Sequence, residues 1–508
     1  MRRFLAKNKK LILLAILILG AGFLLRIYQL TLLPIFADEA IYIRWAQVMR
    51  AEETLRFLPL SDGKQPLYMW SVIPFLKLFS DPLFAGRFLS VLSGIATIVG
   101  VFLVTKLLFK SQKIALIASS ITAISPFMVF FDRMALVDSM LATTAVWTFY
   151  LATLTAKTLR LDMAMLTGFA LGAAFLTKSP ALFVAILLPV SVVIIDWPSK
   201  GKEKLKVLLR FLFLAGVSLL IGYGMYNIMR LGPNFHLLSS RNLDYVYPYL
   251  HILETPLDPL LPHLGAALTH FRLMGPWALL ALFVLGAFYS FKSKPKETVL
   301  VLAWIFFPLL AQAEYAKVFT ARYILFIVPF VGMLAASAFR AKKGIWGWAA
   351  GAIFIIFLLH SVYINWLLLS DPEKATLPRS ERSGYLEEWT AGTGIKEVSD
   401  YIRDIHTQFP EDKIVVGTEG YFGTLPDGLQ IYLNGLPEII VVGIGLGIDE
   451  VPKPLAESRE AGNRTFLLVN SSRLGLKAKE AGLTLIAAYP KAVKPDGGRE
   501  ALLLFELD

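Results

Sequence analysis

Long apolar stretches separated by short charged connections run through the first 370 residues or so of the chain. A helix needs about 20 apolar residues to cross the hydrocarbon core of a bilayer, and shorter ones suffice where they pack inside a bundle. The pattern therefore predicts an α-helical polytopic membrane protein with about eleven transmembrane helices, near residues 11–30, 84–109, 113–131, 137–156, 162–177, 180–196, 206–226, 274–291, 298–313, 322–339 and 345–369.

The pattern changes after Asp371, where a helical period alternates with short apolar strands. Residues 395–408 predict a helix, and five segments predict strands, at residues 413–417, 438–442, 465–469, 483–487 and 501–505. We therefore expect two domains: a transmembrane domain over residues 1–370 and a small soluble α/β domain over residues 371–508.

Two further helices are expected at the membrane surface, because their apolar runs are too short to span. Residues 40–56 place Ile41, Trp45 and Val48 on one side of a helix, as in an interfacial amphipathic segment. Residues 67–79 follow a Gly turn and Pro66, which favours a helix start. We predict a second interfacial or re-entrant helix there.

Composition and charge narrow the class of protein. The chain is 56% hydrophobic and carries a net charge of +12, but from Asp371 onward it has 15 basic and 22 acidic residues. A basic membrane region with an acidic tail argues against a nucleic-acid-binding protein, in which the basic charge would form one exposed face. The chain has no cysteine, which excludes disulfides, thiolate nucleophiles and Cys-bound metals.

The distribution of basic residues predicts the orientation. Alternate connections hold 20 Lys and Arg residues, including Arg2, Arg3, Lys7, Lys342 and Lys343, whereas the short connections on the other side hold four: Arg133, Lys178, Lys317 and Arg322. Cytoplasmic loops are enriched in Lys and Arg. We expect a multi-pass protein of the cell membrane with its N-terminus in the cytoplasm and its C-terminal domain outside, where it would assist substrate engagement without supplying chemistry.

With this topology the charged motifs gather on the outer face, beside the bilayer. Ionised groups at a membrane boundary are costly unless they serve a pathway or a site. A carboxylate can take a proton from an acceptor hydroxyl, and Lys and Arg can offset the charge that grows on a departing phosphate. The set suits a lipid-linked phosphate substrate, although Lys178 and Lys317 taken singly also fit membrane anchors at helix ends. Its acids are Asp38, Glu39 and Asp138, and its bases are Lys64, Arg133, Lys178, Lys317 and Arg322.

Four of the six histidines lie between residues 227 and 274. Their spacing fits no compact zinc pattern, which favours an aromatic interfacial loop. No cofactor is required by the sequence. A divalent metal assembled from separate loops, with Asp38 or Asp138 as a ligand, is left open.

Five motifs carry a resemblance to a known family. They are residues 36–45, with Asp38-Glu39; Lys64-Gln-Pro-Leu-Tyr-Met-Trp70; Arg87-Phe-Leu-Ser90; Arg133-Met-Ala-Leu-Val-Asp138; and Leu176-Thr-Lys-Ser-Pro180. In order and spacing, over roughly the first 200 residues, they resemble the membrane glycosyltransferases of the C-type fold. More narrowly they resemble the protein O-mannosyltransferase and aminoarabinose transferase group.

The resemblance implies the roles of single residues. Asp38 would be the general base that acts on the acceptor, with Glu39 beside it and Asp138 as the second acid of the site. Lys64 and Arg133 would contact the donor phosphate. Arg322 would contact it too, although the motif around Arg322 resembles the family less closely. The donor would be a polyprenyl-phosphate sugar and the acceptor an extracytoplasmic protein hydroxyl, lipid or glycan. We expect transfer with inversion.

Two positions depart from the aminoarabinose transferases. Those enzymes tend to have Arg where this chain has Ile41, and an acid where it has Gly63. The sugar and the acceptor therefore stay open. An alternative function also stays open: a transporter or flippase for a lipid-linked saccharide. A protein of that class would more naturally show internal repeats and broken helices near the bilayer midplane. A non-catalytic scaffold for the tail would leave Asp38 and Arg133 without a purpose.

Overall fold

The computed structural model describes residues 9–341 and 344–507, so Arg2, Arg3, Lys7, Lys342 and Lys343 of the predicted cytoplasmic set lie outside the described residues. The chain forms two compact units. The helical unit comprises Met1–Tyr28, Arg56–Tyr68 and Phe88–Pro378. The mixed unit comprises Gln29–Leu55, Met69–Arg87 and Arg379–Asp508. The expected domain boundary at residue 370 was drawn from hydropathy and stays a prediction.

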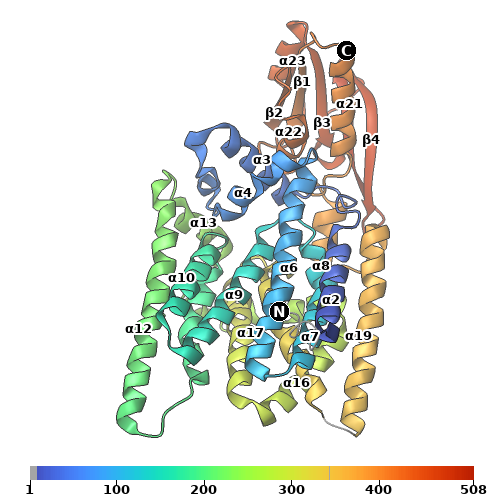
Figure 1. Ribbon diagram of the computed structural model, residues 1–508. Helices are drawn as coiled ribbons and strands as arrows, with labels where there is room; N and C mark the ends of the chain where they lie inside the picture. Colours follow the sequence, from blue (N-terminus) through green and yellow to red (C-terminus); the bar gives the residue numbers. More distant parts are fainter. Residues whose placement is uncertain (1–8, 342–343, 508) are drawn as a thin grey trace. The chain divides into compact units, whose positions relative to one another are not determined.

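Each predicted apolar run of the helical unit lies on helical structure (Figure 1). Two helices, α4 (Leu67–Val72) and α6 (Pro82–Phe109), have residues in both units. The other α-helices of this unit are α2 (Lys9–Ile27), α7 (Gln112–Ile124), α8 (Pro126–Phe131), α9 (Val137–Thr158), α10 (Leu161–Phe175), α11 (Ala181–Leu187), α12 (Gly201–Tyr226), α13 (Leu237–Tyr245), α14 (His251–Glu254), α15 (Leu260–Met274), α16 (Trp277–Ser293), α17 (Pro295–Tyr315), α18 (Val328–Ala336) and α19 (Ile345–Ser370).

Six helical segments in the described ranges are long and apolar enough to cross a membrane, and the α15–α16 pair, bent by 108°, gives up to seven. Some expected spans are interrupted. The run at 113–131 breaks between α7 and α8, where Pro126 begins the new helix. Proline lacks the N–H that a continuing helix would need and is tolerated at a first helical position. The polytopic helical fold class is confirmed, and the number of eleven crossings stays a prediction.

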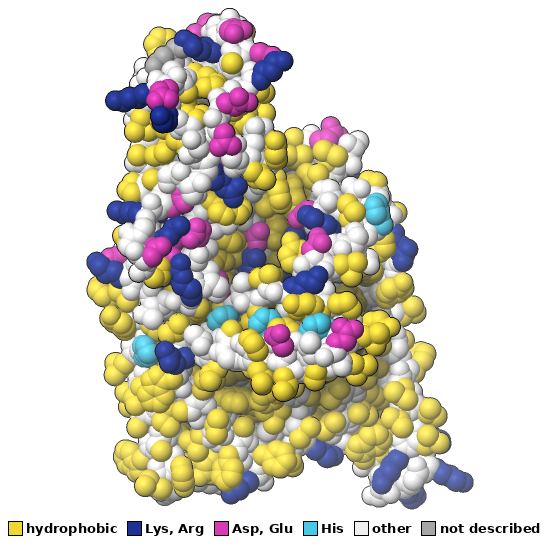
Figure 2. All heavy atoms as spheres, turned by 180° about the vertical axis from the view of Figure 1, so that it is seen from behind, with side chains coloured by type: hydrophobic (Ala, Val, Ile, Leu, Met, Phe, Trp, Pro, Cys, Tyr) yellow, Lys and Arg dark blue, Asp and Glu magenta, His cyan; other side chains and the backbone are white. Residues whose placement is uncertain are grey.

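Small residues let the helices approach closely, as is usual in membrane bundles. Helix α10 packs between α9 and α12. A Cβ on Gly168 of α10 would lie 2.8 Å from the carbonyl oxygen of Ser218 in α12, and the Ser218 hydroxyl donates to the carbonyl of Ala164 at 2.8 Å. Figure 2 shows hydrophobic side chains over much of the helical surface, with Lys and Arg side chains gathered where α12 begins.

The mixed unit contains the predicted sheet. Its five strands have the order β2-β1-β3-β5-β4, with β1 parallel to β2 and β3, and β5 antiparallel to β3 and β4. The parallel strands are joined through helices, as such connections require. Its elements are α3 (Ala37–Ala51), α5 (Phe75–Leu78), α20 (Arg379–Arg382), α21 (Ile395–Gln408), β1 (Ile414–Glu419), α22 (Asp427–Leu433), β2 (Ile439–Gly445), α23 (Lys453–Glu460), β3 (Arg464–Asn470), β4 (Leu483–Val493) and β5 (Arg499–Leu507).

The α/β character of the tail is thus confirmed, and α21 begins and ends at the expected residues. Helix α3 packs against α22 in this unit. The two expected interfacial segments are helical as well: residues 37–51 form α3, and residues 67–78 form α4 and α5, with Pro74 between them.

Candidate active site

A buried acid and a half-buried base meet in the helical unit. Asp138 lies in the first turn of α9, where the helix dipole favours a negative charge. Lys178 lies in the connection between α10 and α11, and its Nζ is 2.6 Å from Oδ1 of Asp138. The side chains are 3% and 22% exposed, respectively. Two of the predicted outer-face residues, which are 40 residues apart in the sequence, therefore form one pair.

Two further predicted cations lie around this pair. Burial lowers the pKa of Lys178, Asp138 opposes that shift, and the charges of Arg322 and Lys64 lower the pKa further. Lys178 Nζ lies 5.0 Å from the centre of the Tyr323 ring, and the Arg322 guanidinium lies 5.8 Å from the same centre. The charges of Lys64 and Arg322 therefore both act on Lys178, and we call the side chains of Lys64, Lys178 and Arg322 the cationic group.

The loop before Lys64 is held in place by specific contacts. Gly63 has a φ of +66°, which favours glycine, and a Cβ there would lie 2.7 Å from Cβ of Arg241. Arg241 forms an ion pair with Asp62. The Gln65 amide donates to the Ser179 hydroxyl at 2.8 Å, which ties the Lys64 loop to the Lys178 connection. The segment Lys64-Gln65 and the segment Lys178-Ser179 are therefore neighbours in space.

Arg133 contacts the end of a helix. Its Nη1 donates to the carbonyl oxygens of Leu25, Arg26 and Tyr28, at 3.2, 3.0 and 2.7 Å. These carbonyls are at the C-terminal end of α2, where helices leave acceptors without intrahelical donors and where positive charge is favourable. Arg133 therefore holds the α2 end in position, and its predicted contact with a phosphate is not tested by this arrangement.

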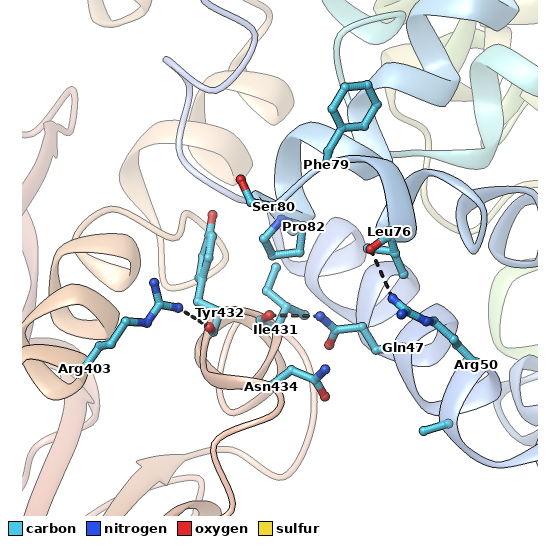
Figure 3. Close-up of a pocket in the computed structure, with 11 residues that line it drawn as sticks. Gln47, Arg50, Leu76, Phe79, Ser80, Pro82, Arg403, Ile431, Tyr432 and Asn434 are labelled. Carbon is cyan, nitrogen blue, oxygen red and sulfur yellow. Dashed lines mark hydrogen bonds between the residues drawn. The ribbon is translucent and has the colours of Figure 1, made fainter. Parts of the chain in front are cut away.

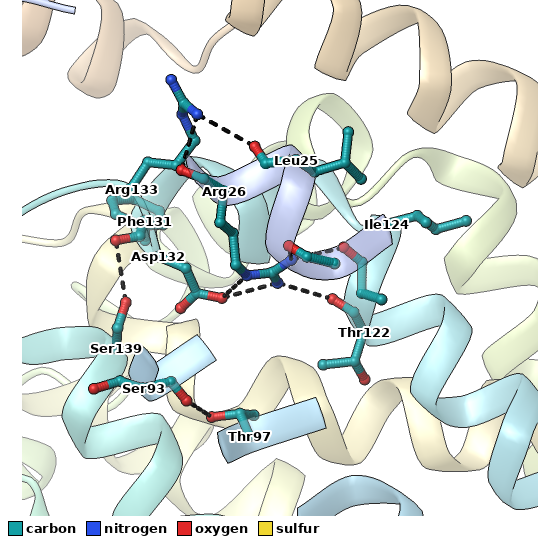
Figure 4. Close-up of polar contacts among 12 residues, drawn as sticks. Leu25, Arg26, Ser93, Thr97, Thr122, Ile124, Phe131, Asp132, Arg133 and Ser139 are labelled. Atoms are coloured by element: carbon teal, nitrogen blue, oxygen red, sulfur yellow. Dashed lines mark hydrogen bonds and ion pairs between the residues drawn. The ribbon is translucent and has the colours of Figure 1, made fainter. Parts of the chain in front are cut away.

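An ion pair that the sequence analysis missed lies beneath this helix end (Figure 4). Arg26 Nε donates to Oδ2 of Asp132 at 2.9 Å, and both side chains are fully buried. Arg26 also donates to the carbonyls of Gly22, Ala123 and Thr122. In the sequence, Arg26 is a charge at the end of an apolar run, and Asp132 is a second charge directly before Arg133. No sequence pattern indicates that these two residues form a pair.

Glu39, in the mixed unit, is engaged by a buried arginine. Arg87 donates from Nε to Oε1 of Glu39 at 2.8 Å and from Nη2 to Oε2 at 2.7 Å, and both side chains are buried. The backbone N–H of Phe36 donates to Oε2 at 3.0 Å, which caps the start of α3. Such bidentate pairs fix geometry as well as charge. Arg87 also donates to the carbonyls of Leu30, Leu33 and Pro34.

Asp38 is a half-buried residue in the first turn of the same helix, α3. The chain before it is fixed to the C-terminal segment of the mixed unit: the Ala37 N–H donates to the carbonyl of Thr390 at 3.1 Å, and the Phe36 ring lies 4.3 Å from that of Tyr385. These contacts within the unit set the direction of α3 and with it the position of Asp38.

The histidine segment forms helices α13 to α15 rather than an open loop. His263 and His270 stack on Phe319, and His251 Nδ1 lies 3.7 Å from the buried Glu314 carboxylate. Among the residues the structure describes, no three His, Asp or Glu side chains are grouped so as to hold a metal ion. We derive no step through a metal.

Residues 63–223 match the family described as dolichyl-phosphate-mannose-protein mannosyltransferase. A search of curated proteins gave no significant match.

Solved structures share the fold at low sequence identity. ArnT from Cupriavidus metallidurans bound to undecaprenyl phosphate has a TM-score of 0.59 and 14% identity, over 99% of this chain and 98% of that one. Its apo form has a TM-score of 0.55 and 15% identity, over 98% of each chain. The oligosaccharyltransferase of Archaeoglobus fulgidus has a TM-score of 0.50 and 12% identity, over 90% of this chain and 69% of that one. The chain therefore shares its fold with these membrane proteins, and its residues 63–223 are similar to the dolichyl-phosphate-mannose-protein mannosyltransferases.

Proposed function

We propose that this protein transfers one sugar from a polyprenyl-phosphate donor to a hydroxyl of an extracytoplasmic acceptor, with inversion at the sugar carbon. The acceptor class is a protein hydroxyl, a lipid or a glycan. The match to protein mannosyltransferases and the fold shared with a protein that binds undecaprenyl phosphate both support a lipid-phosphate donor.

The observation that carries the proposal is the cationic group. The positive charges of Lys64 and Arg322 both act on Lys178, which pairs with the Asp138 carboxylate. A bound phosphate would add negative charge beside these cations. As the bond between the sugar carbon and the phosphate oxygen breaks, the phosphate gains negative charge, and fixed cations stabilise that charge more strongly in a site shielded from water.

Asp38 is the proposed general base. In the transfer step the acceptor hydroxyl loses its proton to the Asp38 carboxylate while its oxygen bonds to the sugar carbon. The bond from that carbon to the phosphate oxygen breaks, and polyprenyl phosphate departs with the electron pair. A single displacement of this kind inverts the configuration. A positioned base of this type contributes about 10²–10⁴-fold to the rate.

The remaining predicted residues receive supporting roles in this proposal. Glu39 anchors α3 through Arg87 and so positions Asp38. Asp138 holds Lys178 within the cationic group, and Arg133 secures the end of α2. The N-terminus is proposed to be cytoplasmic and the C-terminal segment extracytoplasmic, so that the acceptor is met outside the cell.

The test is an assay of the purified protein with a panel of polyprenyl-phosphate sugars, read by mass spectrometry. We expect cleavage of at least one donor, seen as free polyprenyl phosphate together with transferred or hydrolysed sugar. A flippase would move the intact lipid across vesicle membranes without cleaving it. Transport of an uncleaved donor, with no cleavage of any panel member, would therefore contradict the proposal.

A further inference from the structure

A cavity of about 410 Å³ lies within the mixed unit (Figure 3). Its size is in the range of small-molecule sites. Helix α3 contributes Gln47 and Arg50, and the α5–α6 segment contributes Leu76, Phe79, Ser80 and Pro82. The C-terminal part of the unit supplies Arg403 from α21, with Ile431, Tyr432 and Asn434 from α22 and its end. None of these residues belongs to the cationic group.

Two cationic side chains line this cavity. Arg50 and Arg403 approach it from opposite sides in Figure 3. Each donates to a backbone carbonyl: Arg50 Nη1 to Leu76 at 3.1 Å and Arg403 Nη2 to Tyr432 at 2.6 Å. In the described ranges neither guanidinium is ion-paired with a carboxylate. No acidic residue lines the cavity, so the cavity favours an anionic ligand.

A buried acceptor at the same cavity lacks a donor. Gln47 is 9% exposed, and its Nε2 donates to the carbonyl of Ile431 at 2.9 Å. That bond fixes the amide orientation and leaves Oε1 buried without a hydrogen-bond partner. A buried polar atom without a partner costs free energy, and in a binding site a ligand donor removes the cost. The Oε1 atom therefore favours a ligand that also carries hydroxyl groups.

Neutral polar groups complete the lining. Ser80 and Asn434 offer a hydroxyl and an amide, and Tyr432 offers a phenol whose pKa is raised by burial, so it stays protonated. Phe79 supplies an apolar ring. An aromatic face, several neutral hydrogen-bonding groups and two cations together suit a sugar that bears a carboxylate or a phosphate.

We propose that this cavity binds an acidic saccharide unit of the acceptor. The inference rests on the proposed function. Helix α3 carries the proposed base, Asp38, in its first turn and Gln47 and Arg50 near its end. At 1.5 Å per residue these positions are about 14–18 Å apart along the helix axis. The hydroxyl that receives the sugar is therefore on another part of the acceptor than the bound acidic unit, so the acceptor is an extended glycan or glycolipid.

Direct binding to the full chain in detergent tests the inference, with glucose 1-phosphate, glucuronic acid and glucose as probes. We expect both acidic probes to bind and glucose to bind at least tenfold more weakly. Arg50→Gln and Arg403→Gln should each weaken the acidic probes by about tenfold or more, since a hydrogen bond to a charged group contributes roughly 1.5–3 kcal/mol. Lys77→Gln removes an exposed cation of α5 outside the lining and should leave binding unchanged.

Several results would overturn the inference: equal binding of glucose and the acidic probes, equal losses in Lys77→Gln and the two arginine variants, or no binding of any probe. Binding only to phosphatidylglycerol vesicles, and to no soluble probe, would identify a lipid headgroup site instead. Donor cleavage in the absence of acceptor separates this inference from the proposed function. The Lys77→Gln control should cleave the donor at the wild-type rate, whereas failure of cleavage in the wild type would count against the proposed function alone.

Discussion

Lys178 and Asp138 are 40 residues apart in the sequence, and Nζ of Lys178 lies 2.6 Å from Oδ1 of Asp138. The pair joins two motifs that the sequence presents separately. It also places one carboxylate among the cations Lys64, Lys178 and Arg322. The charge state of Lys178 should therefore govern the affinity for a phosphate.

Donor affinity should depend on pH through Lys178. Burial lowers the pKa of Lys178, and Asp138 opposes that shift. A phosphate binds the protonated amine, so donor affinity should fall as the pH rises through a value below that of an ordinary lysine. Asp138→Asn removes the opposing charge, so the fall should move to lower pH. An arginine at this position stays protonated, so Lys178→Arg should abolish the fall in donor affinity with pH. Binding titrations across pH check this, and identical profiles in all three proteins would refute it.

The buried Arg26–Asp132 pair should make Gly94 intolerant of a side chain. A Cβ at Gly94 would lie 2.4 Å from Oδ2 of Asp132 and 2.7 Å from Nε of Arg26. Gly94→Ala should destabilise the protein by about 1–3 kcal/mol, as overpacking typically does. Gly20→Ala, in α2 with no atom within 4 Å of its Cβ, should not destabilise it. Thermal unfolding in detergent measures both, and equal midpoints would contradict the packing described.

Glu39 should be needed for the stability of the mixed unit. Removing one partner of a buried ion pair typically costs about 3–5 kcal/mol because the other charge is left without compensation. We expect a loss of this size in Glu39→Gln. The single change Arg87→Lys keeps the charge but loses the guanidinium fork that contacts both carboxylate oxygens. It should therefore also lower the stability of the protein. Denaturation curves decide the matter: an inactive Glu39→Gln protein of wild-type stability would indicate that Glu39 acts in the chemistry.

The proposed topology places residue 200 in the cytoplasm and residue 394 outside. Reporter fusions at Lys200 and Gly394 should therefore be active on opposite sides of the membrane. The reason is the excess of Lys and Arg in alternate connections, which biases their retention in the cytoplasm. Cytoplasmic signals at both positions would refute the orientation and with it the extracytoplasmic acceptor.

Local patterns predicted many of the elements. The hydropathy runs located the long apolar helices, and short apolar segments located all five strands of the sheet. Helix α21 was bounded correctly because Gly394, with a φ of +90°, directly precedes it and its apolar period ends at Gln408. The sequence did not predict α22 and α23, because these helices are too short to show a clear amphipathic pattern.

The sequence could not predict which charged residues pair with each other over long distances along the chain. The partner of Glu39 is Arg87, 48 residues away, and the partner of Arg26 is Asp132, 106 residues away. Spacing along the chain carries no information about such pairs, because they depend on how helices pack. Arg133 illustrates the same limit, because the sequence did not indicate that it donates to the carbonyls that end α2.

The most direct test of the proposed chemistry measures donor affinity and turnover separately in Asp38→Asn and Lys64→Ala. Asp38→Asn keeps the shape of the side chain but loses the proton acceptor, so turnover should fall by about 10²–10⁴-fold with donor affinity unchanged. Lys64→Ala removes one charge of the cationic group, so both donor affinity and turnover should fall. A fully active Asp38→Asn enzyme, or a Lys64→Ala enzyme with unchanged donor affinity, would contradict the account.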